Sequence, residues 1–284
     1  MFVITLLALV GAAIAAPSAF APFIVEGSAP NALAPRIVGG TDANIEDYPF
    51  MANILIAFEE ENPFPYMSFC GGSLITSRSV LTAAHCLMSS EIEQGLVDKS
   101  QFRVRLGSSL PYTGGHLHRV ESLLDHPGYA YPKAYHDIGI LKLATPAILS
   151  DCVALAPIAG PNYWVPDNTT LTTAGWGTIQ SFFRPAEILQ QVDIKMINHD
   201  FCRENYAKLQ SVHGDDIPNV TSEMVCAGLL AGGKGVCYGD SGGPLLHQGV
   251  VIGITSWGQP CARAEFPGVF VNVPSYTSWI VDNA

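Results

Sequence analysis

Short β-branched and aromatic runs, separated by Gly, Pro, Asn and Ser, follow one another from residue 37 to the end of this 284-residue chain. Runs of this length between turn residues are typical of antiparallel all-β sandwiches and barrels. Helical spacing is clearest over residues 275–281, where Tyr276, Trp279 and Ile280 fall at i, i+3 and i+4. A second candidate helix covers residues 198–210. We therefore expect a mostly β fold with a C-terminal helix, its clearest strands covering residues 79–83, 102–106, 138–143, 170–174, 250–256 and 268–273.

The first 36 residues differ in composition from the rest of the chain. Residues 2–16 form one apolar run, shorter than the ~20 residues of a membrane span and stopped by Pro17. A run of this length beginning at the N-terminus indicates a signal peptide over residues 1–16, although no Lys or Arg precedes it; a buried core segment is the alternative. Residues 17–36 are rich in Pro and Ala and predict a short propeptide that ends at Arg36. We expect a secreted, extracellular protein, in a compartment where disulfides persist.

The charge balance excludes one class of partner. The chain has 14 basic and 25 acidic residues, a net charge of −11, whereas a nucleic-acid-binding protein needs the opposite sign. No second apolar segment is long enough to span a membrane, so we expect no membrane association. The Gly- and Pro-marked stretch 159–168 predicts a link between two halves, about 37–160 and 161–284, and the acidic run 59–61 predicts a solvated loop. The sequons at Asn168 and Asn219 are candidate glycosylation sites.

The most specific motif is the string Gly239-Asp240-Ser241-Gly242-Gly243-Pro244. A serine hydroxyl is a poor nucleophile at neutral pH and needs a neighbouring base. Glycines on both sides permit a tight turn and a close approach of substrate, and successive N–H groups in such a turn can converge on an oxyanion. A single Gly-x-Ser-Gly turn is often only a turn, but the six-residue string is far more specific.

Two further strings supply the groups that such a serine needs. His85 follows an apolar run in Leu81-Thr82-Ala83-Ala84-His85-Cys86, and Asp137 opens another in His136-Asp137-Ile138-Gly139. Taken alone, His85 is best explained as a core residue and Asp137 as a strand cap. Placed together, an aspartate behind a histidine fixes the tautomer of the imidazole and stabilises the imidazolium.

The order His, Asp, Ser, with Ile37-Val38-Gly39-Gly40 ahead of them, resembles the chymotrypsin-like serine proteases of the trypsin superfamily. The resemblance covers residues 37–284 and includes the strings at 173–177, 256–258 and 267–270. It implies an all-β fold of two packed six-stranded antiparallel β-barrels with a C-terminal helix. It also implies that Ser241 is the nucleophile, His85 the general base and Asp137 its orienting partner. The N–H groups of Gly239 and Ser241 would form the oxyanion hole, and Ser256-Trp257-Gly258 would pair with the substrate main chain.

The same resemblance implies activation by proteolysis. Cleavage after Arg36 by a trypsin-like protease would free the amino group of Ile37, which in this family pairs with the aspartate before the serine, here Asp240. Such a buried ion pair orders the oxyanion loop and the specificity pocket. The expected partners are protein and peptide substrates, the activating protease and protein protease inhibitors, for a chain that acts as a monomer without a cofactor.

The residues expected around the specificity pocket predict which bond is cut. Trypsins carry an aspartate at the pocket floor, and the corresponding residue here is Gly235, followed by Val236. Burying an Arg or Lys side chain there would desolvate a charge without a partner. Gly258 and Gly268 leave the walls open, and Tyr238 flanks the mouth unless it is only an exposed aromatic. We therefore expect cleavage after Phe, Tyr or Leu, with a broader elastase-like or collagenolytic specificity as the alternative because Glu265 lies close in sequence.

A digestive endopeptidase is favoured over two other classes of function. A secreted binding protein would be expected to have lost one of the three catalytic residues, and a regulatory protease of a cascade would prefer Arg. His116 and His118 would share one face of a strand, but exposed polar positions explain them better than a metal site. The segment 106–119 contains no Asp or Glu, so we expect no calcium there, and no metal elsewhere.

Seven cysteines is an odd number, and the count alone permits disulfides, a metal site or a reactive thiol. The family resemblance, in the form seen in invertebrate members, implies three bridges: Cys70–Cys86, Cys202–Cys226 and Cys237–Cys261. Cys152 is then left over in an apolar stretch, and we expect a buried free thiol there.

Overall fold

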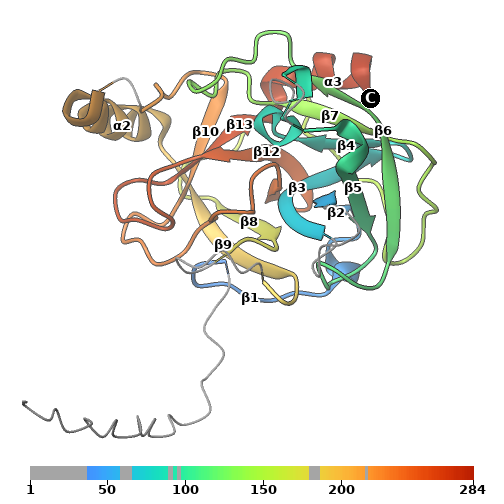
Figure 1. Cartoon of the computed structure of the whole chain (residues 1–284). Coiled ribbons are helices and arrows are strands. Elements are labelled where there is room, and N and C mark those ends of the chain that lie inside the picture. The colour runs from blue at the N-terminus through green and yellow to red at the C-terminus, as the bar shows by residue number, and fades with distance from the viewer. Residues whose placement is uncertain (1–36, 58–65, 89–91, 95–96, 179–185, 215–216) are drawn as a thin grey trace, which may run out of the picture. The chain divides into compact units, whose positions relative to one another are not determined.

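Two barrels of antiparallel strands make up most of the structure, a computed structural model that describes residues 37–57, 66–88, 92–94, 97–178, 186–214 and 217–284 (Figure 1). The predicted acidic loop at 59–61, Arg36 and the segments 1–16 and 17–36 lie outside these residues. Among the described residues, no helix combines the length and apolarity that crossing a bilayer requires.

The first barrel closes in the strand order β2-β3-β4-β7-β6-β5. Its core is the apolar side of these strands, and β2 is buried along almost its whole length because it packs between β3 and β5. The bounds are β2 Met51–Ala57, β3 Tyr66–Thr76, β4 Ser79–Thr82, β5 Phe102–Leu106, β6 His116–Asp125 and β7 Gly139–Leu143.

The second barrel contains six strands in the order β9-β10-β13-β12-β11-β8, and an additional pairing of β8 with β9 closes it. A short strand β1, Thr41–Asp42, adds to its edge by pairing with β9. The bounds are β8 Thr170–Gly175, β9 Gln190–Ile197, β10 Met224–Gly228, β11 Pro244–His247, β12 Val250–Trp257 and β13 Gly268–Asn272. The all-β fold of two six-stranded barrels expected from the sequence is thus confirmed.

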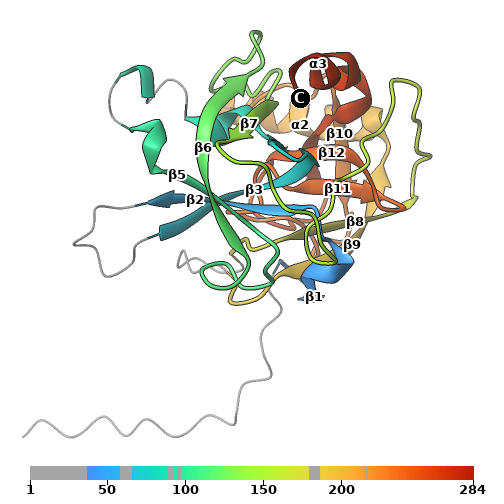
Figure 2. The ribbon, with the colours of Figure 1, turned by 90° about the vertical axis from the view of Figure 1, so that its right-hand side faces the viewer.

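Both predicted helices are present. Helix α2, His199–His213, begins at Asn198, whose side chain accepts a hydrogen bond from the Phe201 N–H and so satisfies one free donor of the first turn. The C-terminal segment is a 3₁₀ helix η5, Val273–Tyr276, that continues into helix α3, Thr277–Asn283. Figures 1 and 2 both place α3 beside β7 of the first barrel, although α3 follows the last strand of the second barrel.

The connection between the barrels runs from the end of β7 at Leu143 to the start of β8 at Thr170 and includes the predicted link 159–168. It is held against the second barrel, because Ala159 N–H donates to Val251 O at 3.0 Å and Ile158 forms a β-bridge with Val251. Asn168, on this connection, and Asn219 are both exposed, so each sequon is open to modification, and glycosylation at both stays a prediction.

The three predicted disulfides are confirmed: Cys70–Cys86, Cys202–Cys226 and Cys237–Cys261. Cys152 is the free cysteine, but the prediction that its thiol is buried is wrong. The residue is half-exposed, because it lies on a surface turn where its Sγ contacts Glu46 Oε1 at 3.7 Å. Partial desolvation and the Glu46 carboxylate raise the pKa of this thiol, which makes it a weak nucleophile.

His116 and His118 lie on one face of β6, opposite Leu106 and Val104 of β5. His116 is exposed and His118 is half-buried, and burial together with His116 lowers the pKa of His118. Among the described residues, no third metal-binding side chain gathers with this pair.

Candidate active site

Asp137 lies just before β7, where its side chain reaches Ser256 of β12 in the second barrel. Its side chain is fully buried and accepts three hydrogen bonds. Two come from His85, from the backbone N–H to Oδ1 at 2.8 Å and from Nδ1 to Oδ2 at 2.8 Å. The third comes from the Ser256 hydroxyl to Oδ2 at 2.5 Å. Burial raises the pKa of Asp137, but the charge of His85 and these hydrogen bonds outweigh it, and the net pKa is lowered.

His85 belongs to a 3₁₀ helix, η2, Ala84–Leu87, that follows β4 directly. Its neighbour Cys86 is bonded to Cys70 of β3, so a covalent link holds this short helix to the barrel wall. Burial alone would lower the pKa of His85. The charge and the hydrogen bond of Asp137 raise it by more than burial lowers it, so the net pKa lies above the ordinary value. The ring is therefore a stronger base than a free histidine.

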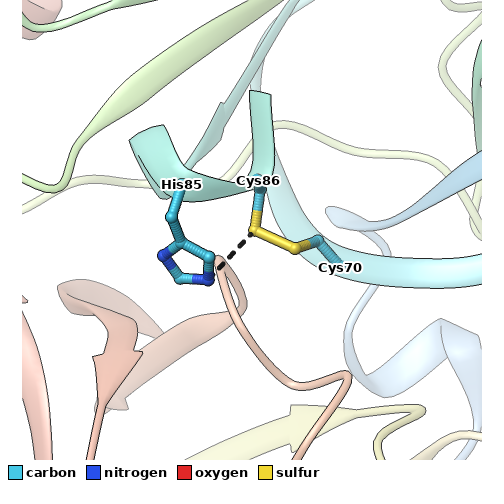
Figure 3. A group of neighbouring side chains, drawn as sticks. All are labelled: Cys70, His85 and Cys86. Atoms are coloured by element: carbon cyan, nitrogen blue, oxygen red, sulfur yellow. Dashed lines mark hydrogen bonds between the residues drawn. A yellow bond between two sulfur atoms is a disulfide. The ribbon is translucent and has the colours of Figure 1, made fainter. Parts of the chain in front are cut away.

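Figure 3 shows the His85 ring beside this disulfide, with Nε2 at 3.7 Å from the Cys86 sulfur. The ligand atoms of Cys70, His85 and Cys86 lie within 4.8 Å of one another, the one such group of three in the described part of the chain. Both sulfurs are consumed by the disulfide, and a metal ligand must be a free thiolate. This group is therefore a structural support for His85 rather than a metal centre.

The Ser241 turn is built against the same wall of the first barrel. Ser241 O accepts a hydrogen bond from Gly71 N–H of β3 at 2.7 Å, next to the bridged Cys70. Gly242 has φ +78°, and a Cβ there would collide with Thr82 and with the carbonyl of Gly71. Only glycine lets the turn approach β4 this closely, so the string predicted as a tight turn is used for a close contact between the barrels.

The backbone of this turn leaves two donors unused. Gly239 has φ +91°, and in the described part of the chain neither its N–H nor that of Ser241 has a protein acceptor. The neighbouring amides of Gly242 and Gly243 are paired, with Thr255 O and Asp240 O respectively. Two unpaired donors flanking a serine are what an oxyanion hole requires.

Ser241 bonds to Gly71, next to Cys70, and Cys70 is bridged to the neighbour of His85, but among the described residues no hydrogen bond joins the Ser241 hydroxyl to the imidazole. Nε2 instead has its contact with the Cys86 sulfur. Such hydrogen bonds are often long without substrate and tighten in the reacting complex. The structure thus brings His85 and Asp137 into direct contact, and it links Ser241 to them through Ser256, which lines the same cavity as Ser241 and donates to Asp137.

A cavity of about 260 Å³ opens next to Ser241. Every residue predicted to bind substrate lines it: Gly235, Val236, Tyr238, Ser256, Trp257, Gly258 and Gly268. No Asp or Glu is among its described lining residues, and its two charged ones, Lys234 and Arg263, are basic. Glu265 does not line the cavity; it is exposed, and its N–H donates to Leu230 O at 3.1 Å.

The three glycines of the cavity differ in how much space surrounds them. A Cβ on Gly268 would lie 3.2 Å from the Val236 side chain and from the Phe270 ring, so any side chain would displace one of them. At Gly258 it would lie 3.6 Å from the Tyr206 hydroxyl. At Gly235 it would meet only Ala262, at an ordinary 3.6 Å, so the floor has room for a larger residue.

Three features of the site were not predicted. A β-bulge in β12 lies between Thr255 and Trp257, and it frees Ser256 from the ladder so that its hydroxyl reaches Asp137. Tyr206 of α2 supports the cavity by donating to Pro267 O at 2.7 Å and by packing edge-on against Trp257 at 4.8 Å. Bulges leave no clear sequence signal, and Tyr206 is distant along the chain.

The third feature is a tight enclosure for Asp240. Its carboxylate is fully buried and accepts from Gly177 N–H at 2.8 Å and from Cys237 N–H at 2.9 Å. A Cβ on Gly175 or Gly177 would collide with it. Burial outweighs these two hydrogen bonds and raises the pKa of Asp240 to about 6. Ile37 is fully buried as well, with φ 48°.

Comparison with known proteins agrees with this geometry. Residues 37–280 match the family described as Trypsin. The chain is 38% identical over 246 residues to "Trypsin, alkaline C" of Manduca sexta, covering 86% of this chain and 90% of that protein. It is 39% identical to "Trypsin" of Phaedon cochleariae, covering 85% of each chain, and 35% identical to "Vitellin-degrading protease" of Bombyx mori, covering 86% and 84%. The chain therefore belongs to the trypsin family of serine endopeptidases.

Proposed function

We propose that this endopeptidase cleaves after large apolar residues, with Ser241 as nucleophile, His85 as general base and Asp137 as its orienting partner. The observation that carries the catalytic part is the buried Asp137 carboxylate, hydrogen-bonded to both the ring and the backbone of His85. Asp137 holds the Nδ1 proton, which leaves Nε2 free to take the proton of the attacking hydroxyl. The free N–H groups of Gly239 and Ser241 then stabilise the oxyanion.

The specificity rests on the cavity beside Ser241. Several relatives are named trypsins, but no described carboxylate lines this cavity, and Lys234 and Arg263 would repel a basic substrate side chain. An Arg or Lys would lose its hydration there without gaining a partner. The apolar contributions of Val236 and Trp257 instead suit Phe, Tyr or Leu.

We expect matched peptides that differ only before the scissile bond to separate these specificities. After activation with immobilised trypsin, kcat/KM for Phe should exceed that for Arg by roughly 100-fold, the equivalent of ~3 kcal/mol for an unpaired charge. Gly235→Asp, for which the floor has room, should raise the rate on Arg and lower that on Phe. Gly160→Asp is the matched control, because a Cβ there meets nothing within 4 Å. A wild-type preference for Arg would refute the apolar specificity, and a preference for Ala would favour the elastase-like alternative.

The pH dependence follows from His85, which acts as a base only when neutral. Asp137 raises the pKa of His85 by more than burial lowers it. We therefore expect kcat/KM to rise with pH around a midpoint above the ordinary histidine value of about 6.5. Asp137→Asn should lower the rate by about 10⁴-fold and move the midpoint to lower pH. A flat profile between pH 5 and 8 would exclude His85 as the base.

The proposed function also includes secretion and activation by proteolytic cleavage. Two buried residues fit a zymogen that is cleaved after Arg36. Ile37 begins the described region, and Asp240 has no charged partner in the described part of the chain. A signal peptide over residues 1–16 would export it. A digestive role stays a prediction, because the relatives' names include both plain trypsins and a vitellin-degrading protease.

A further inference from the structure

Four aromatic residues that have no role in the proposed mechanism pack beside Asp137. We call His126, His136, Tyr276 and Trp279 the aromatic cluster. The rings of His126 and His136 stack with centroids 4.9 Å apart and planes 23° apart. Tyr276 meets both edge-on, at 5.4 and 6.0 Å, and Trp279 lies 5.3 Å from His126. The C-terminal elements η5 and α3 thereby cover the loop that carries Asp137.

The ring of His136 is held from several directions. Its Nδ1 is 2.8 Å from the hydroxyl of Tyr276, which is buried. Its face rests on His126, whose own Nδ1 accepts from Gly128 N–H at 3.1 Å. A Cβ on Gly128 would lie 2.8 Å from the His136 ring, so this glycine provides the space in which the two rings stack. The side chain next to Asp137 is therefore fixed in place.

The backbone of His136 sets the direction of Asp137. His136 has φ 52°, in the left-handed region that few residues other than Gly, Asn, Asp and His adopt. Its carbonyl accepts from Ile138 N–H at 2.7 Å, and Ile138 O accepts from His126 N–H at 3.0 Å, which closes the turn around Asp137. A left-handed residue is maintained only where its surroundings fix it. Here the aromatic cluster supplies that support.

We propose that His136 is a positioning residue, which through the aromatic cluster orients Asp137 toward His85. The inference rests on the proposed role of Asp137 in catalysis. A loosened loop would let the Asp137 carboxylate turn away from the His85 ring, and small misplacements of such groups lower rates by up to about 10²-fold.

The charged and titratable groups around His136 are His126, Tyr276, Glu223 and Asp137. Burial and the neighbouring His136 ring lower the pKa of His126. Burial and the carboxylates of Glu223 and Asp137 raise the pKa of Tyr276, so its hydroxyl stays protonated at neutral pH and remains a hydrogen-bond partner.

The test compares pH profiles of kcat/KM for His136→Ala, His136→Asn, Tyr276→Phe and the activated wild type. His136→Ala should lower kcat about tenfold or more with KM little changed, and the acid limb should move to lower pH because Asp137 raises the pKa of His85. Asn adopts the same backbone region and can bond to the Tyr276 hydroxyl, so His136→Asn should restore most of the activity. His116→Asn, on the exposed face of β6, is the matched control and should match wild type.

The outcomes separate this inference from the proposed function. If Asp137→Asn keeps its activity, the catalytic assignment fails, whatever His136 does. If Asp137→Asn loses activity but neither His136→Ala nor Tyr276→Phe moves the acid limb, His136 is only structural and the inference is overturned. Should His136→Ala fail to fold, an unmoved acid limb in Tyr276→Phe together with wild-type kcat overturns it equally.

Discussion

Replacing Ser241 with alanine should lower kcat/KM by a factor on the order of 10⁵ or more, because the attacking oxygen is lost. A small residual rate should remain, since the N–H groups of Gly239 and Ser241 still stabilise the oxyanion of a water-attacked substrate. The measurement is hydrolysis of a Phe-type peptide after activation with immobilised trypsin. Ser241 lines the cavity and its side chain has no hydrogen-bond partner among the described residues, so the fold should survive the change.

Ser211→Ala provides the matched control, because Ser211 lies on the exposed surface of α2 and, among the described residues, its hydroxyl donates to Lys208 O alone. It should keep wild-type activity. Tight binding of a protein protease inhibitor to Ser241→Ala would show that the site is still formed. Activity within tenfold of wild type in Ser241→Ala would remove Ser241 from the mechanism.

Arg36→Gln should leave the chain inactive under trypsin treatment, at least about 100-fold below the wild type. The reason lies in Asp240, whose buried carboxylate lacks a described cationic partner until a free amino group at Ile37 can pair with it. Removing one partner of a buried ion pair destabilises the surrounding structure by ~3–5 kcal/mol, so the oxyanion loop of the uncleaved chain should be much less stable than that of the cleaved enzyme. Arg203→Gln, on the exposed surface of α2, should activate normally. Full activity of Arg36→Gln without cleavage would contradict the zymogen proposal.

The buried Asp240 should also make the stability of the uncleaved chain depend on pH. The pKa of Asp240 is raised from 3.8 to about 6, so the folded state binds this proton more tightly than the unfolded state. Protonated Asp240 therefore contributes its full share to the free energy of unfolding below pH 3.8. This contribution, about 3 kcal/mol, is lost as the pH rises through 6. After cleavage at Arg36 the stability should no longer fall over this pH range, because an ammonium at Ile37 favours the ionised Asp240 carboxylate.

Both helices and six of the strands, namely β4, β5, β7, β8, β12 and β13, could be predicted because each leaves a local signal in the sequence. Short β-branched runs between turn residues predicted an all-β sandwich or barrel, and the family resemblance implied two six-stranded barrels. Gly239 and Gly242 predicted a tight turn whose positive φ angles the structure contains. The pairing of the cysteines came from the family resemblance, and it was confirmed. Short sequence motifs of this kind predict local structure and family without any knowledge of how distant segments pack.

What could not be predicted depends on packing between distant segments. The hydroxyl of Ser256 reaches Asp137 only because a bulge interrupts β12, and no residue pattern marks that bulge. Cys152 follows an apolar pattern in sequence yet lies half-exposed, because its turn runs over the surface beside Glu46. The aromatic cluster joins a loop after β6 to the C-terminal helix, and its members acquire a shared role only once the barrels have closed.

Covalent labelling of the activated enzyme tests the central claim most directly. Two phosphonate diphenyl esters, one with a Phe side chain and one with an Arg-like side chain, would be reacted with the chain before and after treatment with immobilised trypsin. The adduct would be located by peptide mass spectrometry. We predict that the Phe reagent labels Ser241 much faster than the Arg-like reagent, and only after cleavage at Arg36. Labelling of another residue, or faster labelling of Ser241 by the Arg-like reagent, would contradict the account.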